Sequence, residues 1–549
     1  MARRAQLPRL GWVGGALYDV VTLARCGILT PGSPIRMARQ VLSLTTWGLG
    51  LAGELRQAAV RSPSTVAVVD EAQGEVTYAE LYDRSLRVAA VLHSHGLRPG
   101  SRIGLLARNH VGAVEVMAAA SALGVDLVLL NTGLSGPQLE HVVADQGLAD
   151  VVYDSEFAGV VEGLPAGLSR ETSEDLAAAA LASSTPREPT VPERPGRTII
   201  LTSGTTGVPK GATRRTPRGL SPLTTVVGRI PFRVKDRILV IAPIFHTWGF
   251  GALQVALAMR STVILQRRFD AKAARDALDR YQPQVVFAIP VMLQRMMELP
   301  GDPSERARRA LRVVATSGSA FPSGFTTRFM DAYGDVLYNL YGSTEASWVC
   351  IATPADLRRH PDTAGTPPHG TRVAILGPDG RPVPEGAVGR IFAGNELVFE
   401  GYTSGESKEF VEGMVSTGDL GHFSDGLYFV DGRADDMVVS GGENVYPGEV
   451  ESTLMAHPAV REVAVVGVPD PEFGQRLAAY IVLASGAALT ADDVRQHVRD
   501  TLARHAVPRD VVFVEELPRN ITGKVLNRHL RENHGQHRGK RSHGAHPDA

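Results

Sequence analysis

The sequence of 549 residues contains few cysteines and no long apolar run. Its two cysteines, Cys26 and Cys350, lie far apart and form no Cys-x-x-Cys pair. This spacing argues against a disulfide framework and against a cysteine-bound zinc site, and it favours a reducing compartment, the cytoplasm. Because no stretch reaches about 18 uninterrupted apolar residues, the sequence predicts no transmembrane helix.

The chain also has almost no net charge. Its formal charge is -1 at pH 7, and 44% of its residues are hydrophobic. This balance does not steer a protein to nucleic acid, and it supplies enough apolar side chains for a large core. His-Glu-x-x-His, Gly-x-Ser-x-Gly and a Gly-x-Gly-x-x-Gly that follows a strand are all missing. Their absence argues against zinc metalloproteases, α/β-hydrolases and dinucleotide-dependent dehydrogenases.

The N-terminal segment is apolar at helical spacing between Leu10 and Ala24, and again between Val41 and Gly53. The charge of Asp19 and the lack of a small-residue cleavage pattern argue against a signal peptide. We expect these helices to pack on the protein's own body. The alternative is a peripheral contact of residues 1–50 with the inner face of a membrane.

The main part of the chain alternates strand and helix patterns. Strands are predicted at 102–107 and 125–130 with a helix at 112–124 between them, which is typical of a mostly parallel sheet covered on both faces. The polar, proline-rich stretch 183–197 is predicted to be an exposed linker. From about residue 371, short strands and Asp-Gly turns predict a small antiparallel β-barrel or sheet, and a smaller α+β unit follows Asp435.

Four apolar runs end in a polar or glycine-rich tip. The runs are 198–201, 237–245, 311–316 and 335–340. Ligands of open α/β sheets bind outside the carboxyl ends of the strands, so these tips predict one shared cleft.

The most informative tip is "TSGTTGVPKG", residues 202–211. Its glycines permit close backbone approach, its free N–H groups and hydroxyls suit an anion, and Lys210 adds a positive charge. It is not a Walker A loop, because Pro209 stands where that motif has glycine. The loop therefore indicates a phosphate chain as ligand.

Three further motifs are weaker indications of function when each is taken alone. In "YGSTE", Tyr341 is able to stack on a base and Glu345 to hold Mg²⁺ together with substrate phosphates. In "STGD", Asp419 is able to accept hydrogen bonds from ribose hydroxyls, although turn aspartates are common. Lys524 in "PRNITGKV" is by itself an ordinary surface lysine.

Together, "TSGTTGVPKG", "YGSTE", "STGD", "DGRADDMVVSGGENVYPGEVE" and "PRNITGK" resemble, in order and spacing, the adenylate-forming enzyme superfamily. Within it, residues 55–533 are most similar to actinobacterial fatty-acyl-CoA ligases. The resemblance implies a two-step reaction: a carboxylate attacks ATP to give acyl-AMP and pyrophosphate, and the thiol of CoA then displaces AMP. Its implied substrates are ATP, CoA and a medium- or long-chain fatty acid, with Mg²⁺ as cofactor.

The resemblance also implies roles for particular residues. ATP or AMP would be bound by Thr202, Ser203, Gly204, Thr205, Thr206, Gly207, Lys210, Gly318, Ser319, Ala320, Tyr341, Asp419 and Arg433. The residues assigned to catalysis would be Lys524, Glu345, Thr344 and His246, and Glu345 would also bind Mg²⁺. Asp435 would be the hinge, and Gly441 and Gly442 would line the CoA tunnel.

The fold that the resemblance implies is α/β. Its large domain consists of two doubly wound α/β subdomains plus a small β-barrel, and a small mobile α+β domain follows. The expected boundaries are 1–53 for an N-terminal helical extension, 54–434 for the adenylation domain, 435–533 for the C-terminal domain and 534–549 for a disordered tail. A metal site at the tail histidines, among them His534, is the less favoured reading of that segment.

Three alternatives stay open at this point. The chain could load a carrier protein instead of CoA, or activate an aromatic or other small acid, or bind lipid or nucleotide without catalysis. Lys524, Glu345 and Asp419 occurring together argue against the last of these. The acyl chain length, the oligomeric state and the pathway are not fixed by the sequence.

Overall fold

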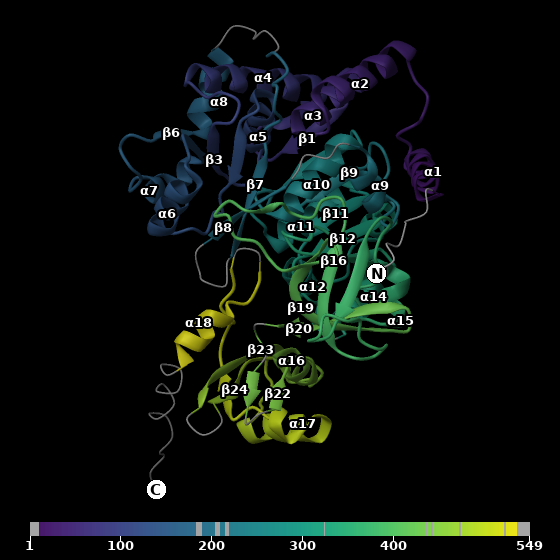
Figure 1. Cartoon of the computed structure of the whole chain (residues 1–549), viewed down its shortest axis with the longest axis vertical. Coiled ribbons are helices and arrows are strands. Elements are labelled where there is room, and N and C mark those ends of the chain that lie inside the picture. Colours follow the sequence, from purple (N-terminus) through teal and green to yellow (C-terminus); the bar gives the residue numbers. More distant parts are fainter. Residues whose placement is uncertain are drawn as a thin grey trace, which may run out of the picture.

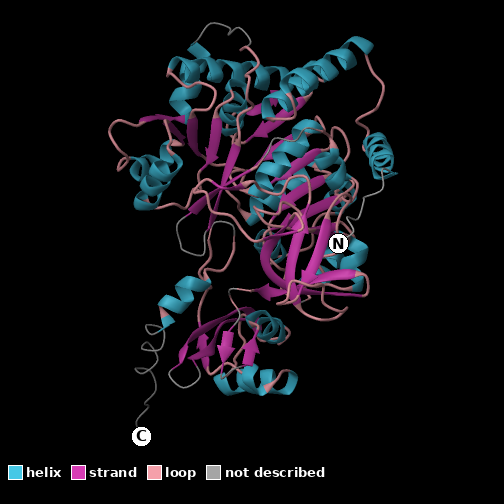
Figure 2. Cartoon of the chain, viewed as in Figure 1, coloured by secondary structure: helices cyan, strands magenta, loops and turns pink. Residues whose placement is uncertain are grey.

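The architecture combines a large upper body with a small lower domain (Figure 1). The computed structural model describes residues 10–182, 189–203, 209–214, 219–322, 324–434, 436, 438–440, 443–470, 474–520 and 523–534. The described strands form four sheets, and helices cover the two large ones (Figure 2). The α/β fold class with a large first domain and a small C-terminal domain is therefore confirmed.

The first large sheet has the order β14-β13-β12-β11-β9-β10-β1-β2. Its strands are β1 (Val66–Asp70), β2 (Gly74–Thr77), β9 (Arg237–Val240), β10 (Thr262–Leu265), β11 (Val285–Ala288), β12 (Val313–Ser317), β13 (Leu337–Tyr341) and β14 (Cys350–Ala352). Six of them, from β13 to β1, run parallel, and an antiparallel strand closes each end. The strands β11 and β12 are buried throughout, as a sheet covered on both faces requires.

The second large sheet has the order β17-β8-β7-β4-β3-β5-β6. Its strands are β3 (Arg102–Leu106), β4 (Asp126–Leu129), β5 (Asp150–Tyr153), β6 (Ser169–Thr172), β7 (Thr198–Ser203), β8 (Pro209–Thr213) and β17 (Gly401–Tyr402). The strands predicted at 102–107 and 125–130 are β3 and β4. They pair in parallel, with Ile103 opposite Leu127.

The helices of the large body are mostly short. They are α1 (Leu10–Arg25), α2 (Pro34–Trp47), α3 (Leu51–Arg61), α4 (Tyr78–Ser94), α5 (Val111–Leu123), α6 (Gly136–Gln146), α7 (Ala158–Val161), α8 (Ser173–Ala182), α9 (Ser221–Val227), α10 (Thr247–Ala258), α11 (Ala271–Tyr281), α12 (Pro290–Met297), α13 (Glu305–Ala310), α14 (Phe325–Tyr333) and α15 (Pro354–Arg359). None of the helices in the described ranges is long and apolar enough to cross a membrane.

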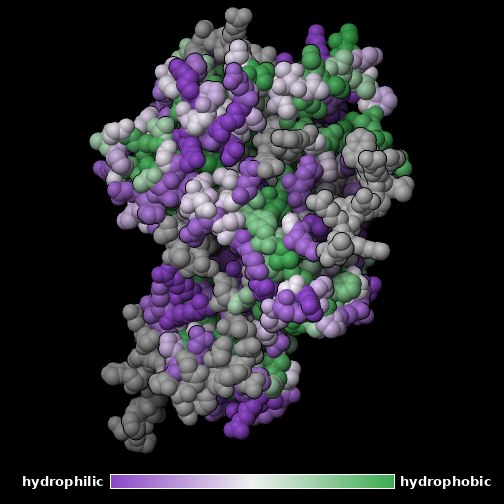
Figure 3. Space-filling view, viewed as in Figure 1, coloured by the Kyte–Doolittle hydropathy of each residue, from purple (hydrophilic) through white to green (hydrophobic). Residues whose placement is uncertain are grey.

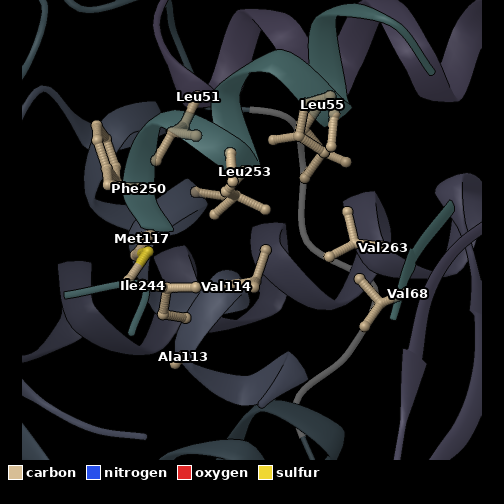
Figure 4. Close-up of a cluster of buried hydrophobic side chains, with 14 of the residues drawn as sticks. Leu51, Leu55, Val68, Ala113, Val114, Met117, Ile244, Phe250, Leu253 and Val263 are labelled. Carbon is tan, nitrogen blue, oxygen red and sulfur yellow. The ribbon is translucent and has the colours of Figure 1, made fainter. Parts of the chain in front are cut away.

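The largest core lies where α3, α5 and α10 pack together beside the first sheet. Leu55 of α3, Met117 of α5 and Leu253 of α10 are fully buried there, and Val68 and Val263 enter from the strands (Figure 4). Nearly every residue of α5 is buried, which explains why its sequence is apolar on all sides. The apolar segment 41–53 therefore divides between α2 and the start of α3, which belongs to this core.

The segment after residue 371 is antiparallel, as predicted. The strands β15 (Arg372–Leu376), β16 (Gly389–Gly394) and β19 (Met414–Ser424) pair in this order, and both β18 (Phe410–Val411) and β20 (Leu427–Arg433) pair with the other edge of β19. The prediction allowed either a barrel or a sheet. Among the described strands this unit is a sheet, since β15 and β20 do not pair and close it into a barrel.

The C-terminal domain is a second α+β unit. Its strands are β21 (Val438–Ser440), β22 (Glu443–Val445), β23 (Val460–Asp470), β24 (Gly474–Leu483) and β25 (Asp510–Phe513), and its helices are α16 (Pro447–Met455), α17 (Ala491–Thr501) and α18 (Asn527–Glu532). The predicted tail begins one residue too early. His534 is buried, and its two ring nitrogens lie 2.7 Å from the Tyr480 hydroxyl and 3.0 Å from Asp510 Oδ2.

Candidate active site

The predicted strand tips come from two different sheets. The runs before His246, Ser317 and Tyr341 end in the first sheet, whereas 198–201 lies in β7 of the second. Arg214, just after β8, joins the two sheets, because its Nε donates to the Thr344 carbonyl over 3.0 Å. The candidate site is therefore built where the edges of the two sheets meet.

Glu345 is the most enclosed carboxylate of this region. Its Oε1 accepts a hydrogen bond of 2.6 Å from the Tyr402 hydroxyl and lies 3.7 Å from Lys408 Nζ. Burial by itself would raise the pKa of Glu345, but the Lys408 charge and the Tyr402 hydrogen bond outweigh it and hold the pKa below its usual value. Glu345 is thus an ionised carboxylate at neutral pH.

This environment fits a Mg²⁺ ion that is held mainly by its substrate. Mg²⁺ takes one or two carboxylates plus phosphate oxygens and keeps several waters. In the described part of the chain, no group of three or more His, Cys, Asp or Glu side chains is placed to hold a metal ion. One charged carboxylate is the donor set that such a shared ion requires.

Asp419 lies at the centre of a second cluster. Its Oδ2 accepts a hydrogen bond of 2.6 Å from the Tyr341 hydroxyl, and Arg433, its partner across β19 and β20, lies 3.3 Å from Oδ1. Burial raises the pKa of Asp419, and the hydrogen bond from Tyr341 and the charges of Arg433, Lys408 and Lys524 oppose the rise. The structure thus brings together the three residues assigned to adenine and ribose.

Gly318, Ser319 and Ala320 form an exposed turn at the carboxyl end of β12. Gly318 has a φ of +109°, a value that favours glycine. A Cβ atom at Gly318 would lie 3.7 Å from Ile289 Cγ2 at the start of α12. The turn therefore lies beside α12 at the rim of the first sheet, where a nucleotide base is expected.

The loop that carries Lys524 rests on this rim. In Figure 1 the yellow segment before α18 reaches from the small domain up to the large one. A Cβ atom at Gly523 would lie only 2.3 Å from Val291 Cγ1, so this glycine is in direct contact with α12. The Lys524 amide donates to Asn520 Oδ1 over 2.9 Å, and the side chain is exposed. The C-terminal domain therefore presents Lys524 toward Asp419.

His246 is the N-cap residue of α10, at the end of the connection that leads from β9 to this helix. Its ring lies 4.6 Å from that of Phe245, and its Nε2 is buried without a hydrogen-bond partner among the described residues. Burial lowers the pKa of His246 to about 4, so the ring is neutral at pH 7. A neutral aromatic ring suits contact with an apolar acyl group better than proton transfer.

The glycine-rich loop is described only at its two ends. Thr202 and Ser203 lie in β7, paired with Lys210 and Pro209 of β8. Lys210 forms an ion pair with Glu406, and its Nζ lies 5.7 Å from the centre of the Tyr402 ring. Gly204, Thr205, Thr206 and Gly207 lie outside the described residues, as do the predicted hinge Asp435 and the tunnel glycines Gly441 and Gly442.

Contacts near residue 435 pass from the large domain to the C-terminal domain. The Ala434 amide donates to the Gly418 carbonyl over 2.9 Å, next to Asp419 in the large domain. Asp436 contacts both domains, because its amide donates to the Arg433 carbonyl over 3.2 Å and its carboxylate pairs with Arg531 of the C-terminal domain at 2.5 Å. The attachment of the chain therefore begins to change domain at Asp436.

Sequence reasoning missed Lys408, Tyr402 and Arg214, which hold Glu345 and Thr344 in place. One signal could have found Lys408. Lysine is rare, with six in the whole chain, and three of them are Lys210, Lys408 and Lys524. In a chain that otherwise uses arginine, a lysine marks a position where a compact point charge is preferred.

Comparison with known proteins agrees with this geometry. Residues 55–403 match the AMP-binding enzyme family, and residues 449–524 match the AMP-binding enzyme C-terminal domain. A feruloyl-CoA synthase of Amycolatopsis is 34% identical over 84% of this chain and 94% of its own length. The long-chain-fatty-acid–CoA ligase FadD13 of Mycobacterium tuberculosis is 30% identical over 87% of this chain and 97% of its own length.

Among solved structures, the o-succinylbenzoate CoA synthetase of Bacillus subtilis in complex with its acyl-adenylate intermediate aligns with a TM-score of 0.77 and 28% identity. That alignment covers 87% of this chain and 97% of the synthetase. The matches follow the same two domains that carry Glu345 and Lys524. The chain therefore belongs to the AMP-binding enzyme family, as an AMP-forming acid–thiol ligase.

Proposed function

We propose that this enzyme converts a medium- or long-chain fatty acid into its CoA thioester in two steps. In the first, a carboxylate oxygen attacks the α-phosphorus of ATP, the bond to the β-phosphate breaks, and pyrophosphate leaves. In the second, the sulfur of CoA attacks the acyl carbonyl, the bond to AMP breaks, and AMP leaves. The observation that carries the proposal is the seating of the Lys524 loop on α12, beside the Tyr341–Asp419 pair.

Each residue of the site has a task in the first step. Asp419 and Arg433 would hold the ribose while the Tyr341 ring stacks on adenine, and the turn from Gly318 to Ala320 would border the base. The glycine-rich loop with Lys210 would wrap the phosphates, and Thr344 would contact the α-phosphate. Lys524 would lie between the two reacting anions and offset their repulsion in the transition state.

Mg²⁺, bound through Glu345 and the phosphates, would neutralise phosphate charge and hold the pyrophosphate for departure. Glu345 meets this task because Lys408 and Tyr402 keep it ionised despite its burial. The second step needs other groups at the reacting carbonyl. Rotation of the C-terminal domain about Asp435 would remove Lys524 and bring Gly441 and Gly442 to a CoA tunnel next to His246.

The fatty acid is the finer part of the proposal. It is supported by the neutral ring of His246, by similarity to FadD13 over nearly its full length, and by the apolar N-terminal helices. A fatty acid partitions into lipid, so we extend the proposal to a peripheral membrane contact of residues 1–50. Similarity to a feruloyl-CoA synthase supports an aromatic acid as the second candidate.

A panel of acids tests the proposal. Saturated acids from acetate to eicosanoate, together with ferulate, are assayed for AMP formation with CoA and, separately, with a holo-carrier protein. We expect kcat/KM with CoA to be highest for acids of about ten carbons or more. A maximum of kcat/KM at ferulate would show that the acid substrate is aromatic and not a fatty acid. A preference for the carrier protein would show that the carrier, and not CoA, is the acyl acceptor. Absence of pyrophosphate release with every acid would contradict the reaction itself.

A further inference from the structure

The first two helices lie along one side of the large body, at the right edge of Figure 1. Each one makes polar contacts with the protein and turns several aliphatic side chains outward. An ordinary surface helix instead packs its apolar face on the core.

The inward face of α1 is mixed, because it buries both Thr22 and Leu23. The Tyr18 ring stacks on His369 with the ring centres 3.8 Å apart, and Asp19 accepts a hydrogen bond from Thr224. The outward face carries Leu17, which is 64% exposed, together with the exposed Val20 and Val21. At about 100° per residue, these three lie on one continuous arc opposite Asp19.

The helix α2 is attached to the body through polar side chains, and several of its aliphatic side chains face away from the body. It is attached to α3 by hydrogen bonds of 2.7 Å from Gln40 to Gln57 and of 2.5 Å from Arg56 to Ser43. Ser43 is the buried residue of this helix. The opposite arc presents side chains that are more than half exposed: Ile35 (65%), Val41 (61%) and Leu42 (62%). Figure 3 shows hydrophobic residues gathered at the upper right, over α2.

The exposed charged side chains near the apolar faces of α1 and α2 are positive. The sequence has no Asp or Glu from residue 20 to residue 53, while Arg25, Arg36 and Arg39 are all exposed. At about 100° per residue, Arg25 lies beside Val21 and Arg39 lies beside Ile35, each at the edge of an apolar arc. Arg36 lies on the side of Ser43, outside the arc. Asp19, the acidic residue of this region, faces the protein through Thr224. An apolar face bordered by cations is complementary to a bilayer that carries anionic headgroups.

A second copy of the chain fits this surface less well. Two such faces in contact would bring arginines of both copies together, and no carboxylate in the segment from 20 to 53 would compensate them. We propose that α1 and α2 form a docking surface for an anionic lipid bilayer, with Leu17, Val20, Ile35, Val41 and Leu42 entering the interface. This inference deepens the peripheral membrane contact proposed above for residues 1–50 and rests on that part of the proposed function, but it does not depend on which acid the enzyme activates.

Vesicle co-sedimentation of the full-length enzyme tests the inference without any substrate. Vesicles of phosphatidylcholine alone are compared with vesicles that also contain phosphatidylglycerol. An apolar variant, I35Q/V41Q/L42Q, and a charge variant, R36Q/R39Q, are measured beside the wild type. The matched control is L181Q/V388Q, which removes exposed apolar side chains from other surfaces.

We expect the wild type and the control to bind anionic vesicles at least about tenfold better than neutral ones. The apolar variant should lose most binding to both, and the charge variant should lose the preference for anionic lipid. Melting temperatures should agree within about two degrees, because the changed side chains are exposed. Equal binding by the wild type and the apolar variant at unchanged melting temperature would overturn the inference.

Two further outcomes would also overturn it. One is a wild type that stays in the supernatant with anionic vesicles. The other is a wild-type dimer, seen by light scattering, that the apolar variant converts to a monomer, since the occupant would then be a second copy. Activity toward a water-soluble acid, measured in parallel, separates failure of docking from failure of the proposed reaction.

Discussion

The ammonium group of Lys408 lies 3.7 Å from a carboxylate oxygen of Glu345, in a part of the site where burial disfavours a lone charge. Lys408 Nζ also donates to the Thr417 carbonyl over 3.1 Å, two residues before Asp419. One cation thus acts on two carboxylates, and the electrostatics of metal and ribose recognition are linked through it.

Replacing Lys408 with methionine should raise the pKa of Glu345, because burial then acts without an opposing charge. We expect acyl-AMP formation to fall by about ten- to a hundredfold near neutral pH, with its acidic limb displaced to higher pH. Pyrophosphate exchange measured from pH 5 to pH 9 reports both effects. K408R should retain most activity, and K272M on the exposed face of α11 serves as control. An unshifted pH profile would show that Lys408 does not set the charge of Glu345.

Lys524→Ala should abolish acyl-AMP formation and spare thioester formation from supplied acyl-AMP. The loop that carries the lysine belongs to the small domain and contacts α12 through Gly523, and in the proposed rotation it would leave the site before the second step. Loss of one positioned charge should reduce the adenylation rate by about a hundred- to a thousandfold. K235A is the matched control. An equal loss in both half-reactions would contradict the assignment.

Asp435→Pro should produce the opposite pattern. The Ala434 and Asp436 amides are hydrogen-bonded within the large domain, whereas the Asp436 carboxylate pairs with Arg531 of the C-terminal domain, so we expect the proposed rotation to change backbone angles near residue 435. Proline fixes φ near −65°. We expect adenylation to continue and thioester formation to collapse, as measured by the two half-reactions separately. A D435A variant that behaves identically to D435P would point to the side chain instead of the backbone.

Glu54→Gln should change stability in a pH-dependent way. Glu54 lies in the first turn of α3 in the main core, and burial raises its pKa from 4.5 to about 8. The folded state therefore holds a proton that the unfolded state releases above pH 4.5. This carboxyl group's contribution to the free energy of unfolding is greatest below about pH 4.5 and is lost as the pH rises toward 8.

Glutamine imitates the protonated side chain at every pH. The E54Q variant should therefore melt at a higher temperature than the wild type at pH 8 and at a similar temperature at pH 5. Differential scanning calorimetry at both values measures this, with E80Q on the exposed first turn of α4 as control. A lower melting temperature at pH 8 would mean that Glu54 is ionised in the fold.

The meeting of Tyr341 and Asp419 could be predicted in outline, because both belong to motifs placed at strand ends or turns. The sequence could not show that the strand tips come from two sheets, since sheet membership depends on which strands pair. Lys408 was missed because its approach to Glu345 depends on the path of the short segment between β17 and β19. No local pattern encodes that path.

The N-terminal helices illustrate a different limit. Periodicity predicted that Leu17 and Val20 share one face of a helix, but it does not say which way a face points. The expectation that these helices pack on the body holds for Leu51 and Leu55 of α3, whereas α2 packs through Ser43. His534 was placed in the tail because its neighbours are polar. Its burial depends on Tyr480 and Asp510, which lie far away in the sequence.

The contact between Gly523 and Val291 sets how closely the Lys524 loop packs on α12. Because the glycine has no side chain and a φ of +75°, the loop seats flush on α12, and one added methyl group would collide with Val291 at 2.3 Å. If the C-terminal domain rotates as proposed, the balance between its two positions would be sensitive to a single carbon atom that does not touch the reacting groups. A methyl group there would leave Lys524 intact but favour the undocked population, so the ratio of the two half-reaction rates could be tuned without altering any residue that touches the reacting atoms.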